Sequence, residues 1–116
     1  MIFTASKQDL MSGISTAIRA VPAHTTMTIM ECLLIEAEAG TIRFTGNDTE
    51  MGIETTISAV TEEPGVIAVE AKMLSEIIRK LPDENVRFES DENYYVTITC
   101  GKAKFGISGR STEEFS

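Results

Sequence analysis

Three carboxylates stand close together in the segment RFTGNDTEMGIE, residues 43–54. Asp48, Glu50 and Glu54 belong to the residue types that serve as general acids and bases or hold hard cations. Acid–base work would need a cleft that shifts their pKa values, and a cation loop would need more oxygen ligands at closer spacing. The Gly-Asn-Asp sequence is typical of a tight turn in which Asn47 and Asp48 make local hydrogen bonds. We therefore expect a structural turn, with an acid- or metal-dependent enzyme that uses Asp48 and Glu50 as the alternative.

Other groups that could do chemistry are few. The chain holds one histidine, His24, and two cysteines, Cys32 and Cys100, which lie far apart in apolar segments. Without CxxC spacing, and with a single histidine, these residues predict neither a metal site nor a redox motif. We expect two reduced, buried thiols, with a disulfide as the less favoured alternative. No catalytic residue, metal or cofactor is assigned.

The periodicity of apolar residues predicts two amphipathic helices. After a short strand, IFTA, apolar residues recur every three or four positions over about 7–20, where Ser6 and Asp9 resemble a capping box and Pro22 marks the stop. A second stripe, over 71–81, ends before Pro82.

Alternating apolar and polar residues predict three strands after each helix. The first set covers 33–38, 41–45 and 51–59, and the second covers 86–88, 94–100 and 103–107, with a short strand at 66–69 before the second helix. Strand, helix and three strands thus occur twice, which predicts a duplicated βαβββ motif with halves of about 1–60 and 65–109. The expected fold class is α+β: one domain, 1–116, with two adjacent helices packed on antiparallel sheets.

The net charge of −8 on 116 residues argues, by itself, against binding to nucleic acid. The two predicted helices nevertheless carry +3, because five basic residues stand against Asp9 and Glu76, so the rest of the chain carries −11. Most of these cations fall opposite the apolar stripes. Two of them, Arg79 and Lys80, could also serve only to complement the dipole of their helix. An acidic protein with a mildly basic helical face suits a polyanion that it surrounds without gripping it.

Apolar runs of the roughly 20 residues that span a bilayer are missing, and the first residues lack the features of a signal peptide. We expect a cytoplasmic protein without membrane contact.

Three stretches of the sequence resemble the N-terminal domain of a known family, the bacterial DNA polymerase III beta subunit or sliding clamp. They are TIMECLLIEAEAGTIRFTGNDTEMGIE, EEPGVIAVEAKMLSEIIRKLP and CGKAKFGISGRSTEEF, and together with their order they extend the likeness over the whole chain. The resemblance implies a three-domain subunit that dimerises head to tail into a ring around duplex DNA. Such a ring tethers the replicative polymerase for processive synthesis and has no chemistry of its own.

The same resemblance implies which residues face DNA. Helices line the hole of the ring, so Lys72, Arg79 and Lys80 are the first candidates, followed by Arg19 and the loop after the first helix. In that loop His24 stands where the family usually has Arg or Lys, and a neutral imidazole would weaken the contact. The rival reading is a protein-interaction scaffold that binds no DNA.

The resemblance also bears on partners. The family continues beyond residue 116 into a middle and a C-terminal domain, so we expect the pocket for DNA polymerase III and clamp-loader peptides to lie outside this sequence. The last strand, 102–108, is expected at the edge that meets the neighbouring subunit. Phe105 and Ile107 are either contacts of that interface or part of the core. An uncovered edge would also favour weak self-association.

Overall fold

The computed structural model describes residues 1–23, 25, 28–113 and 115, so the predicted DNA-facing His24 lies outside the described residues. The elements of the first part are β1 (Ile2–Ser6), α1 (Lys7–Ala17), the 3-10 turns η1 (Ile18–Ala20) and η2 (Thr28–Glu31), β2 (Cys32–Glu38), β3 (Thr41–Asn47) and β4 (Gly52–Ser58). Those of the second part are β5 (Val60–Glu63), β6 (Gly65–Glu70), α2 (Ala71–Lys80), β7 (Asn85–Ser90), β8 (Tyr95–Cys100) and β9 (Ala103–Ser108).

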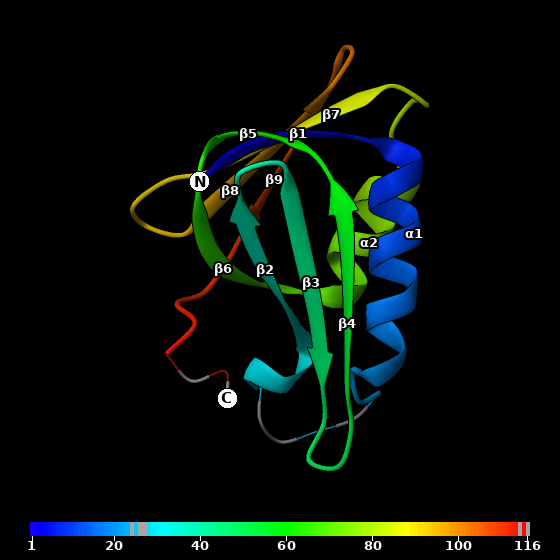
Figure 1. Ribbon diagram of the computed structural model, residues 1–116, viewed down its shortest axis with the longest axis vertical. Coiled ribbons are helices and arrows are strands. Elements are labelled where there is room, and N and C mark those ends of the chain that lie inside the picture. Colours follow the sequence, from blue (N-terminus) through cyan, green and yellow to red (C-terminus); the bar gives the residue numbers. More distant parts are fainter. Residues whose placement is uncertain (24, 26–27, 114, 116) are drawn as a thin grey trace.

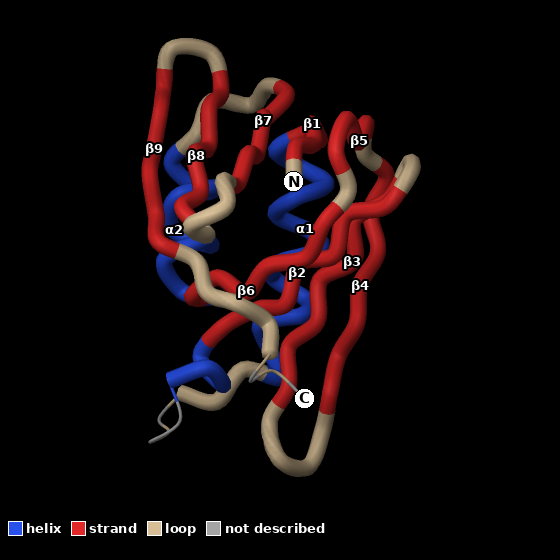
Figure 2. Tube along the Cα trace, turned by 90° about the vertical axis from the view of Figure 1, so that its left-hand side faces the viewer, coloured by secondary structure: helices blue, strands red, loops and turns tan. Residues whose placement is uncertain are grey.

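The strands form two antiparallel sheets. Sheet A has the order β5-β1-β7-β8-β9, and sheet B has the order β4-β3-β2-β6. The helices α1 and α2 are in contact and lie on one side of the molecule (Figure 1). Viewed from the opposite side, the strands stand in front and both helices lie behind them (Figure 2). The predicted α+β fold, with two adjacent helices on antiparallel sheets, is confirmed.

One apolar core lies between the helices and the sheets. Leu10 and Ile14 of α1 and Leu74 and Ile78 of α2 are buried in it with residues from both sheets. In sheet A, Phe3 lies opposite Phe88, and their rings stack with centroids 4.8 Å apart. Because both helices use their apolar stripes here, their polar faces remain outside.

The end of α1 lies very close to sheet B. A methyl group at Gly46 of β3 would overlap the carbonyl oxygen of Ala17, and one at Gly13 would press against the ring of Phe44. The hydroxyl of Thr55 in β4 donates to the carbonyl of Gly13 at 2.8 Å. These two glycines therefore let α1 approach the sheet at backbone distance, which fixes where the helix pair lies.

Three details differ from the prediction. The first helix ends at Ala17 and continues to Ala20 as a 3-10 turn, and η2 was not predicted. Strand β5 was not predicted either, because three of its four residues are exposed and VTEE shows no apolar alternation. It joins the edge of sheet A beside β1. The element order β6-α2-β7-β8-β9 repeats that of β1-α1-β2-β3-β4, while the duplication of the halves stays a prediction.

Among the described residues, no helix has the length and apolar character required to cross a bilayer.

Candidate nucleic-acid interface

Helix α2 carries three of the predicted DNA-facing cations. It begins after Glu70, whose carboxylate accepts a hydrogen bond from the backbone N–H of Met73 at 2.9 Å. The apolar stripe of Leu74, Ile77 and Ile78 is buried, although Met73 is exposed. Lys72, Arg79 and Lys80 are exposed on the face that turns away from the core. The helical periodicity that buries one stripe therefore presents these three cations to solvent.

The charged ends of these side chains are largely unpaired. Arg79 Nη2 donates to the hydroxyl of Ser75 at 3.1 Å, which is a contact with a neutral group. The Lys72 and Lys80 ammonium groups make no hydrogen bond or ion pair with any other residue that the structure describes. Their charge is available to an external anion.

Helix α1 and the 3-10 turn η1 that follows it add a surface of small, polar side chains and the exposed cation Arg19. Ser6 caps the helix, as predicted, by accepting a hydrogen bond from the N–H of Asp9 at 3.1 Å. The hydroxyls of Ser15 and Thr16 fold back on the carbonyl of Ser12. Arg19 is exposed in η1 at the end of this helix. We call Arg19, Lys72, Arg79 and Lys80 the basic helical face.

Lys7 does not belong to this face, although it is one of the five basic residues in the predicted helices. Its side chain is half-buried, and its ammonium group donates to the carbonyls of Arg79 at 3.0 Å and Leu81 at 2.5 Å. A lysine in the first turn of a helix is unfavourable for that helix's own dipole. Lys7 therefore gains nothing from the dipole of its own helix.

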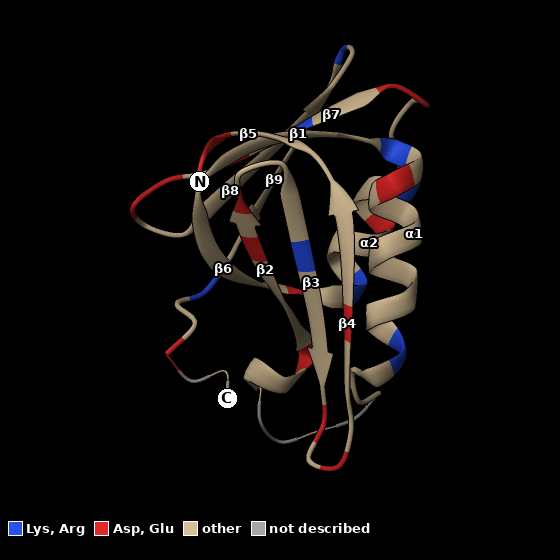
Figure 3. Ribbon diagram, in the orientation of Figure 1, with Lys and Arg blue, Asp and Glu red and all other residues tan. Residues whose placement is uncertain are grey.

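The arginines of the sheets form ion pairs with carboxylates, unlike those of the helices. Arg43 makes two hydrogen bonds to Glu36, at 2.7 and 3.1 Å, which raise the pKa of its guanidinium. Arg87 pairs with Glu62 at 2.7 Å and Glu89 at 3.3 Å, with the same effect on its pKa. Acidic residues also mark strands and turns of the sheets, including the β3–β4 turn (Figure 3). The sheet side therefore repels a polyanion that the helix side attracts.

The three carboxylates of the 43–54 segment do not form a site. Asp48 Oδ1 accepts hydrogen bonds from the N–H groups of Glu50 and Met51, each at 2.7 Å, so it closes the β3–β4 turn. Glu50 and Glu54 are exposed. The described part of the chain contains no group of three or more His, Cys, Asp or Glu residues that could hold a metal ion. The predicted structural role of Asp48 in this turn is confirmed.

Both cysteines are free thiols in the core, as predicted. Cys32 and Cys100 are each 2% exposed. Burial raises the pKa of both thiols, because the charged thiolate loses solvation. For Cys32 the guanidinium of Arg110 acts in the opposite direction, but burial is the larger effect.

Strand β9 forms an edge of sheet A, and its two apolar candidates differ. Ile107 is 5% exposed and belongs to the core, whereas Phe105 is partly buried and packs against it. The side chain of Ile107 therefore packs within the domain. A role for either residue in contact with a neighbouring subunit stays a prediction.

The sequence matches the family described as DNA polymerase III beta subunit, N-terminal domain, over residues 1–116. It is 32% identical to the beta sliding clamp of Bacillus subtilis and 30% identical to that of Synechococcus elongatus, covering 99% of this chain in both cases. These alignments cover 32% and 31% of the relatives, so the chain spans about a third of their length.

Solved structures agree. A candidate DNA polymerase III beta subunit from Eubacterium rectale matches with a TM-score of 0.96 and 48% identity, over all of this chain and 32% of the other. The sliding clamp of Bacillus subtilis matches with a TM-score of 0.96 and 32% identity, over 100% of this chain and 33% of the other.

Proposed function

Because the chain belongs to the DNA polymerase III beta subunit family, through its N-terminal domain, we propose that it forms part of a sliding clamp. This clamp is a ring of two head-to-tail subunits around duplex DNA, and it tethers the replicative polymerase. The domain contributes a segment of the ring's wall, with α1 and α2 toward the DNA and the sheets outward. Its role is to bind and to encircle, without catalysis.

One observation carries the proposal: the four cations of the basic helical face are exposed and pair with no carboxylate of the described residues, whereas the sheet arginines Arg43 and Arg87 are ion-paired. Unpaired cations gathered on the helices of an otherwise acidic protein attract phosphates to that side. Four cations give few phosphate contacts, so the binding is weak, independent of sequence and strongly dependent on salt. A ring that must move along DNA needs this kind of contact.

The remaining partners follow from the same assignment. The chain would pair with another copy of the subunit in the ring, with β9 among the edges available for that contact. Contacts with DNA polymerase III and with the clamp loader would use regions of the subunit outside these residues. The proposed location is the cytoplasm, where the replicating DNA of a bacterium lies.

The test compares two matched charge reversals. In the protein, Lys72→Glu with Lys80→Glu changes two exposed lysines of α2, while Lys102→Glu with Lys104→Glu changes two exposed lysines of the β8–β9 hairpin. Binding to a short mixed-sequence DNA duplex is followed by NMR titration at about 20 mM salt, where weak complexes are visible. We expect the helix variant to lose about tenfold or more in affinity and the hairpin variant to change little.

The salt dependence gives a second measure. Four phosphate contacts predict a slope of log K against log salt of about −3.6, at roughly −0.9 for each contact. Equal losses in the two double variants, or DNA-induced shifts on the sheets in place of α1 and α2, would contradict the proposed orientation.

A further inference from the structure

The C-terminal end of α2 lacks the caps that helices usually have. Leu81 has the extended conformation, with φ −75° and ψ 154°, which suits a residue before proline. Pro82 has no N–H to offer to the last turn, and no glycine stands there in the left-handed conformation that closes many helices. The N–H of Leu81 reaches the carbonyl of Ile78 at 3.2 Å, which leaves the following carbonyls in need of donors.

Lys7 supplies these donors from the other helix. Its ammonium group contacts the carbonyl oxygens of Arg79 and Leu81, and its backbone N–H donates to the carbonyl of Glu84 at 3.1 Å. Lys7 is also the first residue of α1. One side chain thus joins the start of α1 to the end of α2, and its positive charge lies at the negative end of the α2 dipole.

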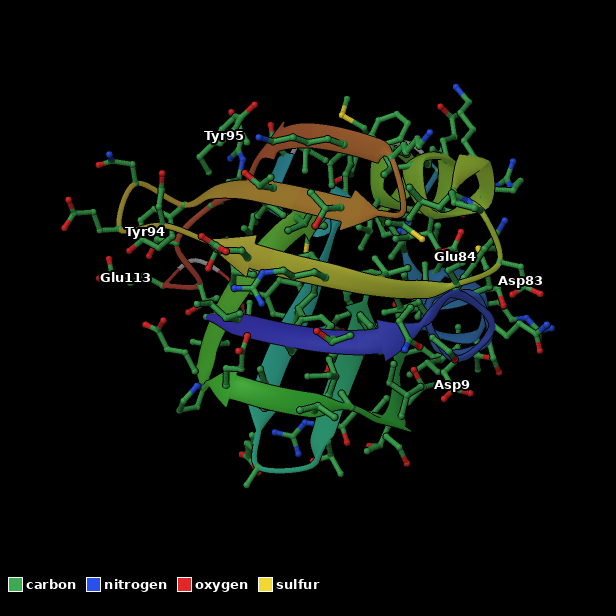
Figure 4. The ribbon with its side chains drawn as sticks, turned by 90° about the horizontal axis from the view of Figure 1, so that it is seen from above. Asp9, Asp83, Glu84, Tyr94, Tyr95 and Glu113 are labelled. Atoms are coloured by element: carbon green, nitrogen blue, oxygen red, sulfur yellow. The ribbon has the colours of Figure 1, made fainter. Side chains whose placement is uncertain are left out.

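Carboxylates are available nearby, yet the ammonium group does not pair with them. Asp9, Asp83 and Glu84 lie at the end of the molecule where α1 begins (Figure 4). None of the three forms an ion pair with Lys7 within the described residues. Instead, Asp83 accepts a hydrogen bond from the side chain of Gln8 at 3.2 Å. The ammonium group of Lys7 is thus directed at two carbonyl oxygens and not at a carboxylate of the described residues.

This arrangement has a consequence for the basic helical face. Basic residues in the last turn of a helix commonly bend back to its free carbonyls and dipole. Here Lys7 occupies that role, so Arg79 and Lys80 keep their side chains exposed, with Arg79 held by Ser75. Lys7 thus contacts the end of the helix from which Arg79 and Lys80 extend.

We propose that Lys7 is a positioning residue of the basic helical face: by capping α2 from α1, it holds the helix end that presents Arg79 and Lys80 to DNA phosphates. This rests on the proposed function. The role differs from a direct DNA contact, because the Lys7 ammonium group is committed to carbonyl oxygens.

The first test replaces Lys7 by methionine, which keeps most of the length of the side chain and removes its donors and charge. With the same DNA duplex and NMR titration, we expect Lys7→Met to bind several-fold more weakly. The salt slope should fall in magnitude by about 1–2, since two cations lose their placement. Lys7→Arg, which retains charge and donors, should restore both values. Gln8→Met removes the neighbouring exposed contact to Asp83 and should leave both unchanged.

A mutant cycle separates positioning from direct contact. In the background Arg79→Met with Lys80→Met, a positioning residue has nothing left to position, so Lys7→Met should cause no further loss. An equal loss in both backgrounds would mean that Lys7 touches DNA itself and would overturn the proposal. Unchanged affinity of Lys7→Met in the wild-type background would also overturn it.

Two further readouts keep the outcomes apart. In the DNA-free protein, Lys7→Met should lower the hydrogen-exchange protection at the end of α2 and in the segment 81–85 more than elsewhere. Another outcome is that protection falls in Lys7→Met while the wild-type protein shows no DNA-induced shifts on the helices. That result would support the contact of Lys7 with the end of α2, but it would overturn both the proposed function and the positioning role that rests on it. Should Lys7→Met not fold, Lys7→Gln, which keeps N–H donors without charge, takes its place with the same expected directions.

Discussion

At the scale of single residues, Asp48 is the clearest structural carboxylate. Its side chain accepts hydrogen bonds from two backbone N–H groups of the β3–β4 turn, those of Glu50 and Met51. We expect Asp48→Ala to lower the free energy of unfolding by about 1–2 kcal/mol, measured by urea denaturation. Asp48→Asn keeps an acceptor oxygen and should recover most of the loss, whereas Glu50→Ala should be neutral. Specific Mn²⁺ binding that is lost in Asp48→Ala would contradict the structural interpretation.

The two buried thiols make the protein's stability depend on pH at the alkaline end. The ordinary thiol pKa of 9.0 is raised for Cys32 and Cys100 in the folded state, mainly by burial. The unfolded chain therefore loses these protons first, and the stability present below about pH 9 should decline as pH rises further. Urea unfolding between pH 7 and 10 measures this, and Cys32→Ala with Cys100→Ala should flatten the decline.

The same environment predicts slow modification of the thiols. At pH 8 we expect neither cysteine to react with a thiol reagent at a rate comparable to that of the unfolded chain, because the thiolate is disfavoured and buried. Rapid labelling of either cysteine under native conditions would show that the core opens locally at that strand.

At the scale of elements, the approach of α1 to sheet B depends on a missing side chain. Gly46→Ala should lower the free energy of unfolding by about 3 kcal/mol or more, since the methyl group overlaps the carbonyl oxygen of Ala17 and the backbone must move. Gly52→Ala, in the neighbouring β4, is the matched control, because its nearest contacts would be at 3.7 Å. Similar losses in both variants would mean that the approach of the helix is not the cause.

Two apolar residues of the edge strand β9 differ in their burial, so substitutions can test its core and its surface separately. Ile107→Ala should lower the free energy of unfolding by about 2–5 kcal/mol, as expected for a buried isoleucine. Phe105→Ala should cost less stability but reduce weak self-association at high concentration, measured by sedimentation equilibrium. A strict monomer in both the wild type and Phe105→Ala would argue against β9 as a contact edge.

How much the sequence predicts also depends on the element. Periods of 3.6 and 2 identify α1, α2 and the core strands, because these elements bury one face and expose the other. Strand β5 escapes this reasoning, since VTEE is mostly exposed and is held by pairing with β1. Lys7 escapes it for a related reason: its partners are backbone carbonyls 72 and 74 residues away, and no side-chain pattern records them.

At the scale of the whole molecule, each sheet contains a strand from the other part of the chain. Strand β1 joins sheet A, whose other strands come from later in the chain, and β6 joins sheet B, which is otherwise built from β2, β3 and β4. Neither half can complete its sheet without the other. Thermal or urea unfolding should therefore be a single cooperative transition with the same midpoint for signals from both halves. Two separable transitions would contradict this interdependence.

The pairing of β1 with strands from later in the chain also affects folding during synthesis. On a ribosome, Phe3 of β1 emerges 85 residues before its sheet partner Phe88. At 5–20 residues per second this corresponds to roughly 4–17 s in which the first strand has at most β5 to pair with. During that interval β1 offers an apolar segment and an open edge to other nascent chains. We therefore expect the risk of misassembly to be greatest during synthesis and to end when β7 pairs with β1.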